Sequence, residues 1–84
     1  MNAKHRKALN AILANPVPKT MPFREIESLL KGLGCVVVKA EGSRVVFVSG
    51  EYAWATHRPH PGKEARRYHI KGVRHFLLTI GATQ

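Results

Sequence analysis

The sequence predicts a single small α+β domain in which two helices precede three strands and a last helix. Its 84 residues are enough for one thin hydrophobic core and too few for two. Apolar residues recur at helical spacing in the first half of the chain and near its end, and β-rich runs stand together between these segments. Hydrophobic residues make up 44% of the composition, so we expect a folded chain rather than a disordered one.

Residues 1–14 predict a short amphipathic helix. Its apolar positions, at helical spacing, are Ala8, Leu9, Ile12 and Leu13. Pro16 and Pro18 should end it, because proline lacks an amide donor and disfavours helical geometry in the residue before it. We therefore expect residues 15–20 to form a connection.

The second helix has the clearest pattern in the chain. Its apolar stripe consists of Phe23, Ile26, Leu29, Leu30 and Leu33. Thr20, with Pro22 behind it, predicts a helix start at Thr20 or Met21. Gly32 and Gly34 predict the end, since glycine takes the left-handed conformation after a helix at little cost.

Residues 35–39, 44–48 and 52–58 form β-rich runs and predict an antiparallel meander. A two-residue turn at Ser49-Gly50 would pair Phe47 with Tyr52, and a three-residue turn would shift that register. One face would carry Val45, Phe47, Tyr52, Trp54 and Thr56, and the other Arg44, Val46, Val48, Ala53, Ala55 and His57. We expect the aromatic face to cover the helices, while a partner could cover the other face.

A connection at residues 60–63 leads to the last helix, which should run from Ala65 or Arg67 to Thr79 and end at Gly81. Its apolar positions are Ile70, Val73, Leu77 and Ile80. Outside that stripe it is strongly basic, with Arg66, Arg67, Lys71 and Arg74.

Fourteen Lys and Arg against five Asp and Glu give a formal net charge of +9. This charge favours a polyanionic partner, and RNA is the one we expect; a basic protein without such a partner is the alternative. Cys35 is the single cysteine, which excludes an internal disulfide. Because the chain has no signal-like segment and no apolar run near the length of a membrane span, we expect a cytoplasmic protein that binds no membrane.

Two imidazoles and a guanidinium fall within His57-Arg58-Pro59-His60-Pro61, where the third predicted strand ends. Imidazole titrates near neutral pH and can transfer a proton during RNA cleavage, and a guanidinium can stabilise the charge that develops on phosphorus. The alternative is a loop stiffened by prolines, with His57 bonded to the sheet and His60 solvated. No acidic or Cys ligands accompany these histidines, so we expect neither a metal site nor a cofactor.

Gly42-Ser43-Arg44 opens the second predicted strand, and Arg44 would project from the same face as His57. A cation would then lie beside a group that transfers protons. The alternative is a turn glycine and a serine that satisfies the turn backbone, followed by a solvated arginine.

From about Phe23 to Gly81 the chain resembles the HicA family, the toxin half of HicA–HicB toxin–antitoxin pairs. The resemblance rests on the helix end Leu30-Lys31-Gly32-Leu33-Gly34, on Gly42-Ser43, on Pro59-His60-Pro61 and on the closing helix. It implies a fold like a double-stranded-RNA-binding domain and a metal-independent endoribonuclease that cleaves mRNA. It also implies neutralisation by a HicB-type antitoxin that covers the active site.

The usual family motif is Gly-Ser-His with a catalytic histidine, and the matching position here is Arg44. Arginine stays protonated at neutral pH and cannot act as a general base. We therefore expect His57, with His60, to supply the missing imidazole. Arg44, the third catalytic residue, would hold the scissile phosphate together with Arg58. The expected RNA-binding residues are Ser43, Arg44, Arg58, Lys63, Arg66, Arg67, Lys71 and Arg74.

These expectations divide the chain into an N-terminal helix with a Pro-containing linker, 1–18, and a HicA-like RNA-binding and RNA-cleaving domain, 19–84. The first segment would either extend the RNA-binding face or dock on the antitoxin. Two other functions stay open: a non-catalytic double-stranded-RNA-binding module, and a protein-interaction domain without RNA activity that uses the apolar sheet face.

Overall fold

A computed structural model describes residues 1–82. The elements in chain order are α1 (Ala3–Leu13), β1 (Thr20–Pro22), α2 (Phe23–Gly32), β2 (Val36–Lys39), β3 (Arg44–Ser49), β4 (Tyr52–His57), β5 (Glu64–Arg66) and α3 (Arg67–Thr79). The helices and the three-stranded antiparallel sheet β2-β3-β4 confirm the predicted α+β class and fit a fold like a double-stranded-RNA-binding domain. The predicted domain 19–84 includes residues 83 and 84, which lie outside the described residues.

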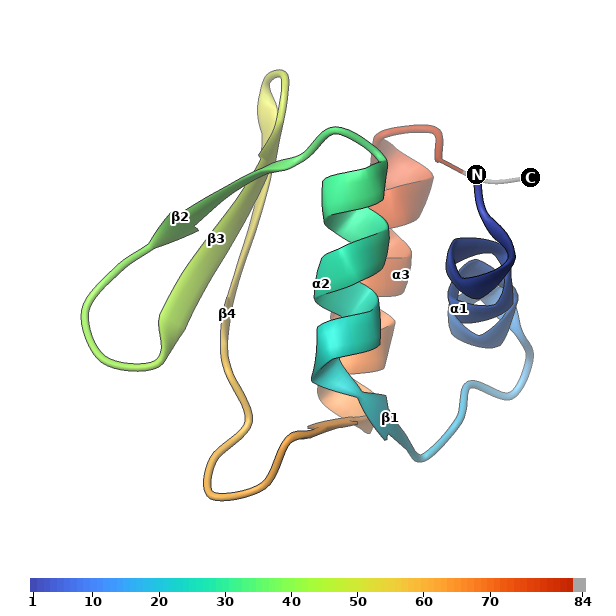
Figure 1. Ribbon diagram of the computed structural model, residues 1–84, viewed down its shortest axis with the longest axis horizontal. Helices are drawn as coiled ribbons and strands as arrows, with labels where there is room; N and C mark the ends of the chain where they lie inside the picture. The colour runs from blue at the N-terminus through green and yellow to red at the C-terminus, as the bar shows by residue number, and fades with distance from the viewer. Residues whose placement is uncertain (83–84) are drawn as a thin grey trace.

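The sheet β2-β3-β4 lies on one side of α2 and α3, and α1 lies on the other side (Figure 1). The face of the sheet that meets the helices carries the large aromatic residues, as predicted. Phe47 stacks on Trp54 with ring centroids 5.6 Å apart, and Trp54 stacks on Phe76 of α3 at 6.4 Å. A Cβ atom on Gly72 would lie 2.9 Å from Nε1 of Trp54, so the missing side chain lets α3 approach the sheet this closely.

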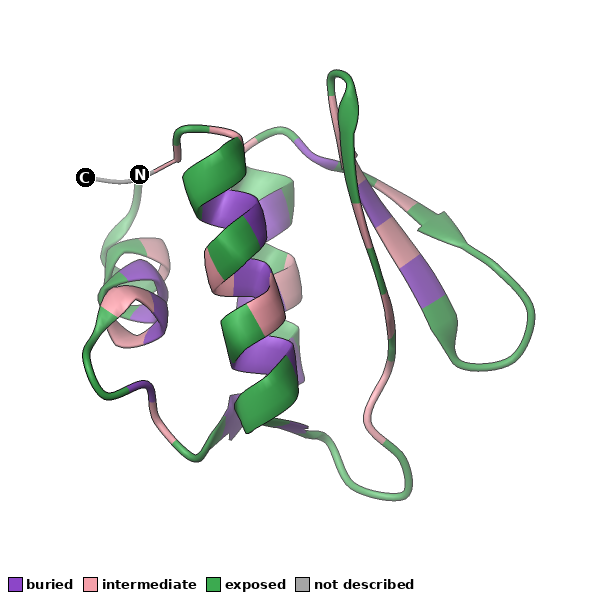
Figure 2. Ribbon diagram, turned by 180° about the vertical axis from the view of Figure 1, so that it is seen from behind, coloured by how far each residue is buried: buried purple, intermediate pink, exposed green. Residues whose placement is uncertain are grey.

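The two faces of the sheet differ sharply in burial (Figure 2). Val45 and Phe47, on the inner face, are fully buried, whereas Val36 and Val38, on the outer face, are 62% and 47% exposed. Ala53 and Ala55 on the outer face are exposed as well. Among residues 1–82, no helix packs on the outer face of the sheet, which is thus an apolar surface.

The predicted register of the β3–β4 hairpin is wrong by two residues, because Phe47 pairs with Trp54 rather than with Tyr52. The turn consists of Gly50 and Glu51, and Gly50 has a φ of 59°, as the first loop position of a type II′ turn requires. Side chains alternate with a period of two along a strand, so a shift of two residues leaves each side chain on its predicted face.

A second, two-stranded sheet joins β1 to β5 and was not predicted. Met21 lies opposite Ala65 in this pair, and both are buried. The predicted helix start at Thr20 or Met21 is therefore wrong: these residues are in a strand, and α2 begins at Phe23, whose N–H donates to the carbonyl of Lys63 at 3.0 Å. Pairing between the strands gives the backbone groups before α2 the hydrogen-bond partners that a helix cap would otherwise provide.

The predicted glycine end of α2 is confirmed. Gly34 has a φ of 90°, and its N–H donates to the carbonyl of Lys31 while that of Cys35 reaches the carbonyl of Leu30. This is the Schellman arrangement, which satisfies the last carbonyls of a helix. At the other side of the molecule, Leu9 and Ile12 of α1 are fully buried in the same core as α2 and α3.

Within residues 1–82, no helix is both long and apolar enough to cross a membrane.

Candidate functional site

Three predicted site residues meet where β3 begins and β4 ends. Arg44 and His57 are direct partners in the β3–β4 register. Nδ1 of His57 lies 3.2 Å from Oγ of Ser43, and the N–H of Arg58 donates to the carbonyl of Ser43 at 2.8 Å. The side chains of Ser43, Arg44 and His57 are all exposed. The structure therefore places an exposed imidazole, oriented by a hydroxyl through one ring nitrogen, opposite an exposed guanidinium.

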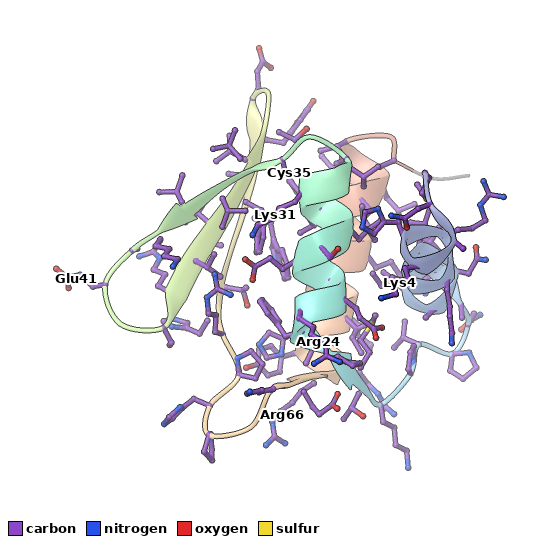
Figure 3. The ribbon with its side chains drawn as sticks, viewed as in Figure 1. Lys4, Arg24, Lys31, Cys35, Glu41 and Arg66 are labelled. Atoms are coloured by element: carbon purple, nitrogen blue, oxygen red, sulfur yellow. The ribbon has the colours of Figure 1, made fainter. Side chains whose placement is uncertain are left out.

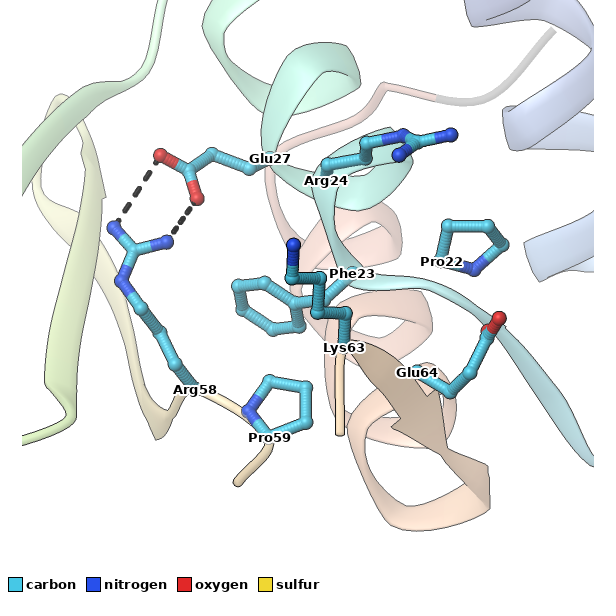
Figure 4. A pocket seen from close by; sticks show the side chains of 8 residues that line it. All are labelled: Pro22, Phe23, Arg24, Glu27, Arg58, Pro59, Lys63 and Glu64. Atoms are coloured by element: carbon cyan, nitrogen blue, oxygen red, sulfur yellow. Dashed lines mark hydrogen bonds and ion pairs between the residues drawn. The ribbon is translucent and has the colours of Figure 1, made fainter. Parts of the chain in front are cut away.

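Arg58 points to the other side of the strand, toward α2. Its guanidinium forms a two-pronged ion pair with the carboxylate of Glu27 (Figure 4). The guanidinium carbon lies 5.9 Å from the centre of the Phe23 ring, a cation–π distance. Lys31 also contacts Glu27, with its Nζ 3.3 Å from Oε2. Arg58 thus ties the end of β4 to the first turns of α2.

The hydrogen bonds from Arg58 hold the pKa of Glu27 below its ordinary value of 4.5, and the charges of Arg58 and Lys31 add to this effect. Partial burial of the carboxylate opposes them and does not reverse the direction. Glu27 is therefore ionised at neutral pH and holds its two cations as a carboxylate.

A cavity of about 420 Å³ opens beside this ion pair (Figure 4). Its lining residues are Pro22, Phe23, Arg24, Glu27, Arg58, Pro59, Lys63 and Glu64. The apolar floor comes from the start of α2 and from the prolines, and the charged groups stand around it. The cavity lies on the helix side of the strand end, whereas His57 lies on the outer side.

His69 is fully buried directly behind the strand end. Its Nδ1 accepts the N–H of Arg66 at 3.0 Å, so the ring proton is on Nε2, which donates to the carbonyl of His57 at 2.9 Å. The ring also meets Phe23 edge to face, with centroids 5.6 Å apart. His69 therefore fixes the backbone of His57 from behind without taking part in the exposed pair.

The other predicted site residues are spread around this strand end. His60 and Lys63 are exposed on the connection from β4 to β5, and Arg66, Arg67 and Lys71 are exposed on β5 and α3. Figure 3 shows Arg66 at the lower end of the molecule, below α2.

Arg74 lies elsewhere. It is half-buried, and its Nη1 donates to the carbonyl of Ala14 at 3.1 Å, just past the end of α1. Its guanidinium thus contacts the N-terminal segment and not the strand end.

The prediction missed three residues that support the site: Phe23, Glu27 and His69. The spacing of Glu27 and Lys31 on one helix does indicate their contact. Nothing local indicates that Glu27 binds Arg58, which is 31 residues away. His69 does have a sequence signal, because it stands four residues before Val73 and seven before Phe76, the spacing of the buried face of α3.

Cys35 follows the upper end of α2, far from Arg66 at the lower end (Figure 3). Its side chain is buried, as expected, and burial raises the pKa of its thiol. In the described part of the chain, no group of three or more His, Cys, Asp or Glu side chains could hold a metal ion.

Comparison with protein families gives a match over the region that carries this site. The model of the HicA toxin of bacterial toxin–antitoxin systems matches residues 23–79, about two thirds of the chain. The match includes α2, the sheet β2-β3-β4 and α3. No curated protein and no solved structure matches the chain. The chain belongs to the HicA family, the toxins of bacterial toxin–antitoxin systems.

Proposed function

We propose that this toxin is a metal-independent endoribonuclease that cleaves mRNA in the cytoplasm and is neutralised by a HicB-type antitoxin. The observation that carries the proposal is the exposed pair at the strand end. There, Arg44 lies opposite His57, and Ser43 contacts Nδ1 of His57.

The chemistry that suits these groups is attack of a ribose 2′-hydroxyl on the neighbouring phosphorus. One imidazole removes the proton of the 2′-hydroxyl, and a second donates a proton to the departing 5′-oxygen. The products are a 2′,3′-cyclic phosphate and a 5′-hydroxyl end, so atoms and charge balance without another reactant. We assign the two imidazoles to His57 and His60.

Arg44 stabilises the extra negative charge on the phosphoryl oxygens in the transition state. A guanidinium suits this role because it stays charged and presents a fork of N–H donors to phosphate. Because Nδ1 of His57 contacts Ser43, we assign the proton transfer to Nε2.

The RNA-binding surface of the proposal consists of Ser43, Arg44, Arg58, Lys63, Arg66, Arg67, Lys71 and Arg74. Arg58 and Arg74 already donate to protein acceptors, so we assign the stronger phosphate contacts to the other members. Residues 19–84 would carry RNA binding and cleavage. Residues 1–18 would support this domain through α1.

The proposed antitoxin site is the outer face of the sheet β2-β3-β4. Val36 and Val38 are exposed there, and the same face ends at Arg44 and His57. A protein that covers the apolar part of this face would also exclude RNA from the catalytic pair.

The proposal is tested by incubating the purified full chain with single-stranded RNA in the presence of a chelator. We expect cleavage that ends in cyclic phosphates. His57→Ala should slow it about 10²- to 10⁴-fold, the usual contribution of a positioned acid or base. His75→Ala, which changes an exposed histidine on α3 outside the proposed site, is the matched control. Undiminished cleavage by His57→Ala would exclude the assignment of His57.

In cells, expression of the chain should arrest growth, and co-expression of an antitoxin encoded beside it should restore growth. His57→Ala should not arrest growth at the same expression level. Arrest by this variant as strong as by the parent would separate toxicity from the proposed chemistry.

A second candidate function is a binding module that holds double-stranded RNA without cleaving it. Arg44 favours it, because arginine follows Gly42-Ser43 here and cannot act as a general base. Such a module would bind RNA with a steep salt dependence and leave it intact. The same chelator assay, run with binding measured in parallel, distinguishes the two functions.

A further inference from the structure

Tyr68 is an aromatic residue on the surface of the first turn of α3, and it is 62% exposed. Its ring stacks on that of His69, with centroids 4.0 Å apart and an angle of 30° between the planes. One face of the tyrosine ring is thus supported from below. The exposed fraction places the rest of the ring in contact with solvent.

The support beneath Tyr68 is rigid. His69 is fully buried and is held by hydrogen bonds at both ring nitrogens, to the N–H of Arg66 and to the carbonyl of His57. A single imidazole therefore separates Tyr68 from the backbone of His57. The tyrosine has a fixed position relative to the strand end.

Most charged residues near Tyr68 in the sequence are cationic, and Glu64, four residues earlier, is the nearest acidic one. Arg66 and Arg67 precede it, Lys71 follows one helical turn later, and all three are exposed. From Ala65 to Gln84 the sequence has no Asp or Glu. An exposed aromatic ring among cations is the arrangement that proteins use to hold single-stranded nucleic acid, with a base on the ring and phosphates on the cations.

We propose that Tyr68 stacks a nucleobase of single-stranded RNA that flanks the bond cleaved at His57, while Arg66, Arg67 and Lys71 bind the adjoining phosphates. The proposal rests on the proposed function, which it deepens by naming single-stranded RNA as the substrate form. Stacking on a tyrosine accepts any base, so Tyr68 would contribute affinity and not sequence preference.

The test measures binding of single-stranded RNA to the full chain with His57→Ala, so that the RNA stays intact. Tyr68→Leu keeps an apolar cover over His69 and removes the aromatic face. We expect it to raise the Kd about 5- to 150-fold, the range that loss of one base–aromatic stack gives. Tyr68→Trp should bind at least as tightly as the parent.

Tyr52→Leu is the matched control, because Tyr52 is also exposed, at 48%, but lies on the β3–β4 hairpin. It should leave the Kd unchanged. RNA that carries 2-aminopurine should lose fluorescence when it binds the parent and lose less when it binds Tyr68→Leu, since stacking quenches the base.

Equal Kd values for Tyr68→Leu and its parent would overturn the proposal and leave Tyr68 as a cover for His69 or as a contact for a protein. A loss of binding that Tyr68→Trp does not restore would overturn it as well. Thermal unfolding of each variant shows whether the fold is kept. If the chain with His57 intact binds RNA but cleaves none, the proposed cleavage fails while the stacking result still stands.

Discussion

His57 and Arg58 are neighbours in the chain, yet the two sides of the strand end on which they lie are built in different ways. On the outer side, Ser43, Arg44 and His57 are exposed, and the contact between Ser43 and His57 is weak and long. On the inner side, Arg58 is paired with Glu27, and the buried His69 uses both ring nitrogens. Each side has one arginine and one histidine, so residue type alone does not show which pair is supporting and which is exposed to substrate. The hydrogen-bond and ion-pair partners of each residue show it.

The largest effect on stability that this comparison predicts comes from His69→Ala. The change leaves the N–H of Arg66 and the carbonyl of His57 without a partner and opens a cavity beside Phe23. We expect a loss of about 3 kcal/mol in the free energy of unfolding, measured by urea titration. His57→Ala, on the outer side, should change it by less than about 0.5 kcal/mol. Similar losses for the two variants would remove the distinction between the sides.

Arg44→Ala should have an effect of similar size, but on cleavage instead of stability. It removes the guanidinium that we assign to the transition-state charge, and loss of one such donor costs about 10²- to 10³-fold in rate. The measurement is kcat for RNA cleavage together with urea unfolding, which should stay within about 0.5 kcal/mol of the parent. A fall in stability without a fall in kcat would place Arg44 with the supporting residues.

Arg58→Ala should act mainly on stability and less on cleavage. It removes the ion pair with Glu27 and the contact with Phe23, and we expect a loss of about 1–2 kcal/mol in the free energy of unfolding. A double-mutant cycle with Glu27→Ala measures the coupling between the two side chains. Lys31→Ala is the matched control, since Lys31 is 59% exposed and its contact with Glu27 should contribute only about 0.3–0.5 kcal/mol. Equal effects of the two cations would contradict the inner-side assignment of Arg58.

The smallest effect is the pH dependence of the same ion pair. Because the pKa of Glu27 is lower in the folded chain than its ordinary value of 4.5, the stabilisation is complete above that value. It is lost as the pH falls through the lowered pKa. We expect the difference in unfolding free energy between the parent and Glu27→Gln to shrink as the pH is lowered from neutral to well below 4.5. A difference that stays constant over this range would show that Glu27 has no shifted pKa.

The sequence allowed a correct prediction of the elements that have the strongest local patterns. The apolar stripe of α2, the glycine after it and the three strands all follow from spacing and turn residues. Each residue of β3 and β4 lies on the sheet face predicted for it, even though the predicted register was wrong. Side chains alternate between the faces along a strand, so a shift of two residues keeps each on the same face. For the same reason Arg44 and His57 share a face as predicted.

The interactions that could not be predicted join segments far apart in the chain. The pairing of β1 with β5 depends on the backbone of Thr20–Pro22 meeting that of Glu64–Arg66. In the sequence, Arg58 stands in a basic segment with no acidic residue beside it, and its ion pair with Glu27 forms only in the folded chain. The spacing of His69 from Val73 and Phe76 places it on the buried face of α3, but its partner, the carbonyl of His57, lies on another element and could not be predicted.

Leu9 and Ile12 are buried against α2 and α3, and Arg74 of α3 holds the carbonyl of Ala14, although the family match begins only at Phe23. The unit that folds cooperatively is therefore larger than the unit that the family shares. Removing residues 1–14 would expose apolar surface of both central helices to water. A cavity made at Leu9 would therefore loosen the core that α2 and α3 share, although Leu9 lies outside the family match.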